Sequence, residues 1–495
     1  MKAEEGQARA FTVLAVAAAS FSMLQSLVSP VLSTIQHDLG TTPNAVAWVL
    51  IAWLLSAAVA TPILGRIGDM IGKNRTLVVA LSAIVVGSVV AALAPNLDVL
   101  VVGRVLQGLG GAVFPLTFGI LRDEFPAQRL ASVVGAMSAV IAVGAGLGTL
   151  LAGPVVALGG WRALFWLPAV VVALTATAAH LLVPASPVRA GGRINWLGAA
   201  LLAAWLVALL VPLSMGDQWG WASPAVIAPL VGSVVLLAAW VVAESRSGHP
   251  VIDMRVMRLR GVWTTNLVAL LFGASMFAVY AYVPVFVQTP AAAGYGFSAT
   301  IGEAGRLLLP ALVTMALGGV LSGPLAPYVG LRAQLASGSA LIAASCAGFA
   351  FVHTSAWEIA VESGVFGLGL GIAYAAMSSV IVQTVPPSQT GAATGMSTNI
   401  RTIGGAIGTA VTATVLAAHP GPSGLPAESG YTTAFVVMGG AALVGMATSF
   451  AVPAARRAAA REPVAATPVE PGAGPVPDLA PGAPASAAVR AGAAG

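Results

Sequence analysis

The chain has 495 residues, of which 58% are hydrophobic and 8% are charged, whereas a soluble globular protein carries about 25% charged residues. This composition excludes a chain of soluble domains, because its apolar surface would lie exposed to water, and it favours a protein that spans a lipid bilayer. The net charge of +5 does not indicate a nucleic-acid partner, because the basic residues gather in short loops and at the chain ends. The single cysteine, Cys346, excludes a disulfide framework and a cysteine-ligated metal site.

Fourteen apolar segments follow one another along the sequence, and each is about 20 residues long, the length that a helix needs to cross a bilayer. The first follows a polar stretch over residues 1–10 and is longer than the core of a signal peptide, so we expect a retained span. An even number of spans places both ends of the chain on one side of the membrane. The segments begin near residues 11, 45, 77, 98, 131, 163, 196, 224, 262, 303, 333, 360, 391 and 432.

The basic residues predict which side this is, because cytoplasmic loops of membrane proteins are enriched in lysine and arginine. Alternate loops are rich in arginine and one of them adds Lys73, while the opposite loops hold only Arg162. We therefore expect a multi-pass protein of the inner or plasma membrane, with both termini in the cytoplasm. The basic residues on the expected cytoplasmic side are Lys2, Arg9, Arg66, Lys73, Arg75, Arg122, Arg129, Arg189, Arg193, Arg246, Arg255, Arg258, Arg260, Arg332, Arg456, Arg457, Arg461 and Arg490.

Short glycine-rich sequences recur at an offset of about 258 to 260 residues, which is typical of transporters built from duplicated helix bundles. The repeat relates spans 1 to 6 to spans 9 to 14 and leaves spans 7 and 8 as an inserted pair. The matching residues are Gly65 and Gly323, Gly72 and Gly330, Gly144 and Gly404, and Gly148 and Gly408.

The repeat and the composition together predict the division of the chain. After the cytoplasmic N-terminus (1–10) we expect a six-helix bundle over 11–184, then a linker with two additional transmembrane helices and a cytoplasmic loop over 185–261. A second six-helix bundle is expected over 262–453. Residues 454–495 are rich in Ala, Pro and Gly and predict a disordered cytoplasmic tail, because they hold too little apolar surface to offset the entropy of ordering.

The loop after the second span carries the most specific motif, the sequence GRIGDMIGKNR over residues 65–75. Gly65 and Gly72 permit a tight turn, and Asp69 stands among basic residues that include Lys73 and Arg75. This sequence resembles the cytoplasmic signature of the major facilitator superfamily. The resemblance implies that Asp69 contacts helix N-termini of the opposite bundle when the cytoplasmic side is closed, an interaction worth roughly 0.3 to 1 kcal/mol.

Two further motifs strengthen the resemblance. Arg104 and Gln107 in the fourth span resemble the superfamily's Arg-x-x-Gln-Gly motif, and the fifth span is similar to the glycine motif of its drug-exporting branch, through Gly144, Gly146 and Gly148. The chain thus resembles the fourteen-helix drug:proton antiporters over roughly residues 11–453. This implies an all-α polytopic membrane protein with the major facilitator fold, two six-helix bundles plus an inserted helix pair.

Charged groups inside apolar spans are costly, at about 2.5 to 3.5 kcal/mol for an arginine, and are candidate functional residues. Arg104 and Arg401 are therefore candidates for the substrate or proton pathway, although Arg104 has the alternative of a structural bond to neighbouring carbonyls or to Gln25. In the first span Gln25 stands where the antiporter family usually carries an acid. With no acid to match the arginines, we expect the cavity to favour neutral or anionic compounds over lipophilic cations.

Other pathway candidates are Gln107 and Tyr374 as polar groups of the cavity, and Glu303 and Glu362 as acids within the first turns of spans 10 and 12. Either acid could carry the proton, or both could belong to an ion-pair cluster at the outer rim, since Arg306 stands one turn from Glu303. Gly144, Gly146 and Gly148 are more typical of close helix packing than of binding.

The sequence also lacks the motifs of other function classes. No G-x-x-x-x-G-K-[ST] loop occurs, so we expect no ATP hydrolysis by this chain, and no hydrolase or metal motif occurs, so we expect no enzyme activity, metal or cofactor. The resemblance therefore implies a secondary transporter that exports amphipathic small molecules, drugs or antibiotics, in exchange for protons by alternating access. The alternatives are a facilitator-type importer or uniporter without proton antiport, and a membrane-embedded enzyme or sensor.

Overall fold

The computed structural model describes residues 2–186, 193–421 and 424–453. Fourteen helices in this part of the chain are long and apolar enough to cross a membrane, which confirms the predicted number of spans. The expected tail over 454–495, with its four arginines, and Arg189 lie outside the described residues.

The first six spans comprise nine helices, because some spans are broken into two. They are α1 (Lys2–Leu27) with α2 (Leu32–Asp38), α3 (Pro43–Val46) with α4 (Trp48–Ile71), α5 (Lys73–Ala92), α6 (Leu97–Gly108) with α7 (Val113–Glu124), α8 (Ala127–Gly159) and α9 (Ala163–Leu182). The inserted pair is α10 (Trp196–Trp219) and α11 (Pro224–Arg246), followed by the short α12 (Met254–Met257). The last six spans are α13 (Arg260–Gln288), α14 (Ile301–Val329), α15 (Leu331–Phe351), α16 (Ala356–Thr384), α17 (Thr390–Ala417) and α18 (Glu428–Ser449).

The helices begin within a few residues of the predicted segments, with one clear exception. Helix α1 begins at Lys2, so residues that we expected to form a separate N-terminal stretch continue the first span. Ala, Glu, Gln and Arg in this stretch are strong helix formers, and apolar content alone does not report where a helix extends beyond the bilayer.

Two equivalent turns reflect the internal repeat. Gly72 separates α4 from α5 with a φ of +118°, and Gly330 separates α14 from α15 with a φ of +74°. Only glycine adopts this backbone without strain, because it has no Cβ. The two loops of the repeat thus make the same abrupt reversal at the same position.

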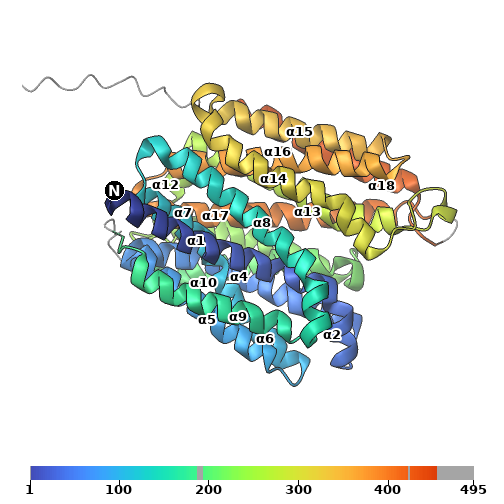
Figure 1. Ribbon diagram of the computed structural model, residues 1–495, viewed down its shortest axis with the longest axis horizontal. Coiled ribbons are helices and arrows are strands. Elements are labelled where there is room, and N and C mark those ends of the chain that lie inside the picture. The colour runs from blue at the N-terminus through green and yellow to red at the C-terminus, as the bar shows by residue number, and fades with distance from the viewer. Residues whose placement is uncertain (1, 187–192, 422–423, 454–495) are drawn as a thin grey trace, which may run out of the picture. The chain divides into compact units, whose positions relative to one another are not determined.

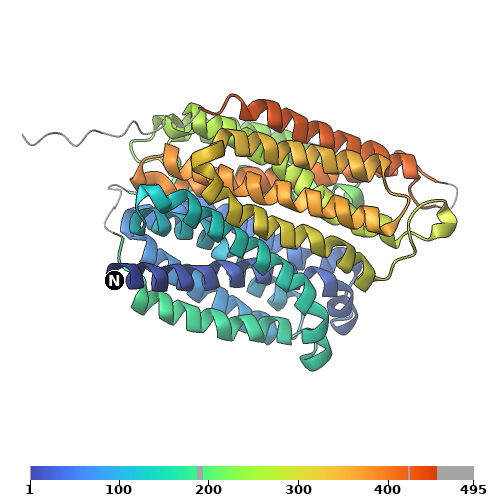
Figure 2. The same ribbon diagram turned by 45° about the horizontal axis from the view of Figure 1, so that its top comes forward.

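The helices form two groups that pack side by side (Figures 1 and 2). Helices α1 to α9 contact one another and are called the N-terminal bundle here, and α13 to α18 contact one another and are called the C-terminal bundle. The bundles meet along two seams, α4 against α17 and α8 against α14, and α10 packs against both α4 and α17. Trp205 of α10 belongs to the same apolar cluster as Ala58 of α4 and Met396 of α17, so the inserted pair covers the first seam.

The loops lie at the two ends of the helices. We call the end where α4 stops at Ile71 and α17 starts at Thr390 the motif side, and Figure 1 marks the N-terminus at this end. The other end, which holds Arg162 and Glu303, is called the opposite side.

Candidate functional site

Asp69, near the end of α4, joins the two bundles. Its side chain is fully buried, and its carboxylate accepts hydrogen bonds from the backbone N–H groups of Gly391 at 3.2 Å and Ala392 at 3.0 Å. These amides lie in the first turn of α17 and have no acceptor within their own helix, so a carboxylate satisfies them and also interacts favourably with the helix dipole. An acid of the N-terminal bundle thus caps a helix of the C-terminal bundle.

Three more charged residues, Lys73, Arg122 and Asp123, complete this cluster. The Lys73 Nζ lies 2.8 Å from Asp123 Oδ2 and 3.9 Å from Asp69 Oδ1, and the Lys73 side chain has no exposed surface. Asp123 also accepts a hydrogen bond from Ser186. Arg122 donates from Nη1 to the hydroxyl of Thr390 at 2.8 Å, which adds a second link between the bundles. Neither the contact of Arg122 with α17 nor the role of Asp123 was predicted from the sequence, although a buried Lys73 requires an acidic partner.

The backbones of α4 and α17 touch beside this cluster. A Cβ added to Gly65 would lie 2.5 Å from the carbonyl oxygen of Gly391, and Asn399 donates from Nδ2 to the carbonyl of Ala58 at 2.6 Å. Four hydrogen bonds between the bundles therefore fall on the first ten residues of α17, and the seam is closed on the motif side. Of the predicted motif residues, Gly72 forms the turn and Arg75 is exposed.

Arg104 lies inside the N-terminal bundle and does not reach the seam. Its side chain is fully buried, and it donates from Nε to the carbonyl of Val49 at 2.9 Å and from Nη1 to Gln107 Oε1 at 2.8 Å. Gln107 in turn donates to Ser88 at 2.8 Å. These contacts match the structural alternative, a bond to neighbouring carbonyls, although Gln25 is not among the partners. A role of Arg104 or Gln107 in the substrate or proton pathway stays a prediction.

We expect Arg104→Met to lower the free energy of unfolding by about 1–3 kcal/mol, because Val49 and Gln107 would each keep a buried acceptor without its donor. Thermal unfolding of the detergent-solubilised protein measures this. Arg401→Met is the control, since the half-buried Arg401 makes no such hydrogen bonds in the described chain, and it should leave the unfolding temperature near the wild-type value. Unchanged stability of Arg104→Met together with lost transport would instead favour the pathway role.

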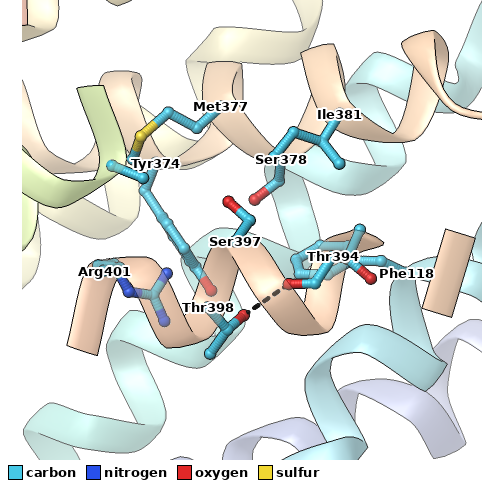
Figure 3. A pocket seen from close by; sticks show the side chains of 10 residues that line it. Phe118, Tyr374, Met377, Ser378, Ile381, Thr394, Ser397, Thr398 and Arg401 are labelled. Atoms are coloured by element: carbon cyan, nitrogen blue, oxygen red, sulfur yellow. Dashed lines mark hydrogen bonds between the residues drawn. The ribbon is translucent and has the colours of Figure 1, made fainter. Parts of the chain in front are cut away.

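A small cavity lies between the bundles, about 9 Å further along α17 than the Asp69 contacts (Figure 3). Its volume is about 20 Å³, which is space for about one water molecule. The lining comes from α7, α13, α16 and α17, namely Phe118, Ala269, Tyr374, Met377, Ser378, Ile381, Thr394, Ser397, Thr398 and Arg401. The structure therefore places two predicted residues, Tyr374 and Arg401, in one cavity, and holds that cavity nearly closed.

The three glycines of the fifth span face two different neighbours. A Cβ on Gly144 would lie 2.5 Å from the Ala19 carbonyl oxygen, and one on Gly148 would overlap Met23 and Ser26, so both glycines pack α8 directly against α1. Gly146 faces Leu312 of α14 instead. Only Gly146 of the three thus lies at the interface between the bundles.

Most of the chain matches one known protein family. A sequence model of the Major Facilitator Superfamily matches residues 14–193 and 181–409. The chain belongs to this superfamily. The fold of this superfamily transporter is similar to the crystal structure of the human organic anion transporter MFSD10, with a TM-score of 0.66 at 15% identity over 90% of this chain and 99% of that one.

Curated relatives of this superfamily transporter include antibiotic exporters. The cephamycin export protein of Amycolatopsis lactamdurans is 31% identical over 83% of this chain and 85% of its own length. The tetracenomycin C resistance and export protein of Streptomyces glaucescens is 29% identical over 83% of this chain and 76% of its own length. A multidrug resistance protein B homolog of Mycobacterium tuberculosis is 28% identical over 79% of this chain and 73% of its own length.

The remaining predicted residues of the transporter lie apart from the cavity. Glu303 is exposed on the opposite side, where it forms a capping box with Thr300 and lies 3.7 Å from Arg306. Glu362 is half-buried in the second turn of α16, and its carboxyl group faces Gly348 of α15. Gln25 is half-buried in α1 and makes no hydrogen bond within the part of the chain that the structure describes.

Proposed function

We propose that this transporter exports amphipathic small molecules, antibiotics among them, from the cytoplasm by alternating access. The named activities of the curated relatives support export. The observation that carries the mechanism is the contact of Asp69 with the N-terminus of α17. Its two hydrogen bonds at the start of α17 join the bundles through a carboxylate and backbone N–H groups, so this contact can break and reform in each cycle.

The motif side is the cytoplasmic side in this proposal. The basic residues support it, since the loops and helix ends on that side hold most of the arginines and lysines of the described chain, and cytoplasmic loops are enriched in them. The opposite side holds Arg162 and Arg306, and both are near an acid, Asp38 and Glu303. The closed seam on the motif side then corresponds to a state in which the cytoplasmic entrance is shut.

Rocking of the N-terminal bundle against the C-terminal bundle would expose the cavity to each side in turn. The cavity in its closed form has room for about one water molecule. A drug-sized molecule needs several hundred Å³, so substrate entry requires the α4–α17 seam to separate.

Proton exchange is the proposed energy source, and Glu362 is the proposed carrier. Glu303 is a weaker candidate, because it already caps α14 and pairs with Arg306. The carboxyl group of Glu362 is half-buried and has no hydrogen bond or ion pair among the described residues, so no partner holds it in one protonation state. A uniporter remains the second candidate, because no acid lines the cavity.

Proteoliposomes with an imposed pH gradient separate the two. For an exchange of one neutral substrate molecule per proton, one pH unit drives about a tenfold accumulation, and Glu362→Gln should remove this response. Glu303→Gln is the matched control and should keep it. Substrate flux that ignores the gradient in the wild-type protein would rule out antiport and leave the uniporter.

A further inference from the structure

The wall of the cavity formed by α16 and α17 carries a positive charge without an acidic partner. Arg401 lies near the middle of α17, and its guanidinium lies 4.5 Å from the centre of the Tyr374 ring. Its N–H groups make no hydrogen bond or ion pair within the described residues, and no carboxylate lines the cavity. A cation at this depth of a membrane protein normally faces a counter-charge or a water-filled path.

Hydroxyl groups line the cavity on one side of this arginine (Figure 3). The hydroxyls of Thr394 and Thr398 donate hydrogen bonds to carbonyls of their own helix, at 2.6 and 3.0 Å. Ser378, Ser397 and the Tyr374 hydroxyl have no hydrogen-bond partner in the described chain, and all three side chains line the cavity. Donors from two helices therefore converge on one small space together with the guanidinium.

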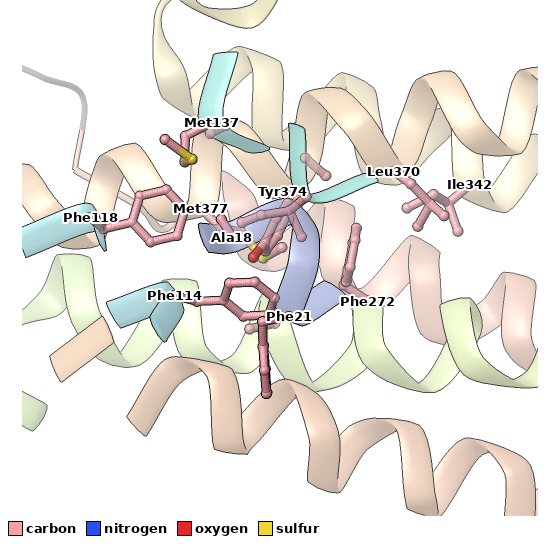
Figure 4. Packing of buried hydrophobic residues seen from close by; sticks show 14 of the residues in the cluster. Ala18, Phe21, Phe114, Phe118, Met137, Phe272, Ile342, Leu370, Tyr374 and Met377 are labelled. Carbon is pink, nitrogen blue, oxygen red and sulfur yellow. The ribbon is translucent and has the colours of Figure 1, made fainter. Parts of the chain in front are cut away.

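The rest of the surroundings is apolar and aromatic (Figure 4). Phe118 of α7 and Met377 of α16 line the cavity, and Phe272 stacks on Tyr374 with 6.4 Å between the ring centres. Such rings favour flat aromatic partners, which stack on their faces or contact their edges. The cavity thus joins one cationic, donor-rich wall to aromatic walls.

We propose that this cavity is a subsite for an organic anion, and that the preferred substrates are aromatic compounds with one ionised acidic group that binds Arg401. This inference rests on the proposed export through the cavity and names its substrate class. The planar guanidinium offers paired donors to a carboxylate or phenolate, while Ser378 and Ser397 supply further donors. Monocationic aromatic compounds would meet the same charge and bind weakly.

Three probes that share one ring system test the proposal: pyrenecarboxylate, pyrenemethanol and pyrenemethylammonium. Their binding to the full chain in lipid nanodiscs can be followed by pyrene fluorescence. We expect the carboxylate to bind at least about tenfold more tightly than the ammonium compound, as one charge-assisted contact would give. Arg401→Gln should weaken carboxylate binding about 10- to 100-fold, leave pyrenemethanol within about twofold, and be partly rescued in Arg401→Lys.

Arg332→Gln is the matched control, because it removes one positive charge from the C-terminal bundle at the start of α15, away from the cavity. It should leave all three affinities unchanged. Equal binding of the carboxylate and the ammonium compound by the wild-type protein would overturn the anion subsite, and this result does not depend on whether any variant folds. Export of cationic dyes that Arg401→Gln does not change would also overturn the anion subsite, but it would leave the proposed export intact. Absence of export by a protein that still binds anions selectively would contradict only the proposed function.

Discussion

Asp69→Asn is expected to abolish net transport while the amount of folded protein in the membrane stays near the wild-type value. The asparagine is neutral and offers one oxygen where the carboxylate offers two, so α17 loses a charged cap and at least one hydrogen bond. If these losses make the closed form about 2 kcal/mol less stable relative to the open form, the ratio of open to closed protein rises about thirtyfold. Drug accumulation in a host that lacks its own exporters measures transport, and gel filtration measures folded protein.

Asp123→Asn is the informative control, because it makes the same chemical change in the same cluster. Asp123 contacts Lys73 and Ser186 within the chain and has no contact with α17 among the described residues. We therefore expect it to lower stability, since Lys73 would lose its close partner, without the same shift toward the open form. Equal transport by Asp69→Asn and the wild-type protein would contradict the proposal that the contact of Asp69 with α17 controls transport.

Gly148→Val is expected to prevent most of the protein from folding. The new side chain would overlap the Met23 carbonyl and the Ser26 hydroxyl of α1. The backbone of α1 at Met23 cannot move aside as easily as the end of a flexible side chain. Overpacking of this kind costs about 1–3 kcal/mol or more. It would also push α8 away from α1, where small residues allow the two helices to pack closely. The yield of monodisperse protein and its thermal unfolding check this.

Two substitutions on the same helix control for the change in helix propensity. A Cβ added to Gly153 would meet no atom within 4 Å, so Gly153→Val should fold like the wild-type protein. Gly146→Ala meets only the flexible end of Leu312 and should fold while shifting the balance between conformations. A folded and stable Gly148→Val would contradict the close packing of α1 and α8.

The number of spans could be predicted because each apolar segment must match the thickness of the bilayer core. This requirement does not depend on which other helices a span contacts. The turn at Gly72 was predictable for a similar reason, since the need for glycine is local. The contact of Asp69 with a helix of the other bundle was expected only through the family resemblance. No property of the residues 65–75 themselves points to Gly391, which lies more than 300 residues away.

The residues of the cavity were harder to predict, because a span that is apolar on all faces does not reveal which face turns inward. Gln107 and Tyr374 were equally plausible cavity groups, yet Gln107 bonds to Arg104 and Ser88 inside the N-terminal bundle, while Tyr374 lines the cavity. Ser378 and Ser397 were missed, since serines are common in membrane helices. Arg401 could be predicted as a candidate, because an arginine within an apolar segment is costly to insert into a membrane whichever face of the helix it occupies.

The distance between the motif-side ends of α4 and α17 tests the proposed alternating access most directly. Spin labels can be attached at Ile71→Cys, whose native side chain is 50% exposed, and at Ser388→Cys, after the single native Cys346 is replaced by serine. In lipid nanodiscs we expect a short distance and a longer one to coexist, and Asp69→Asn to transfer population to the longer one. A single short distance that neither substrate nor Asp69→Asn changes would contradict the account.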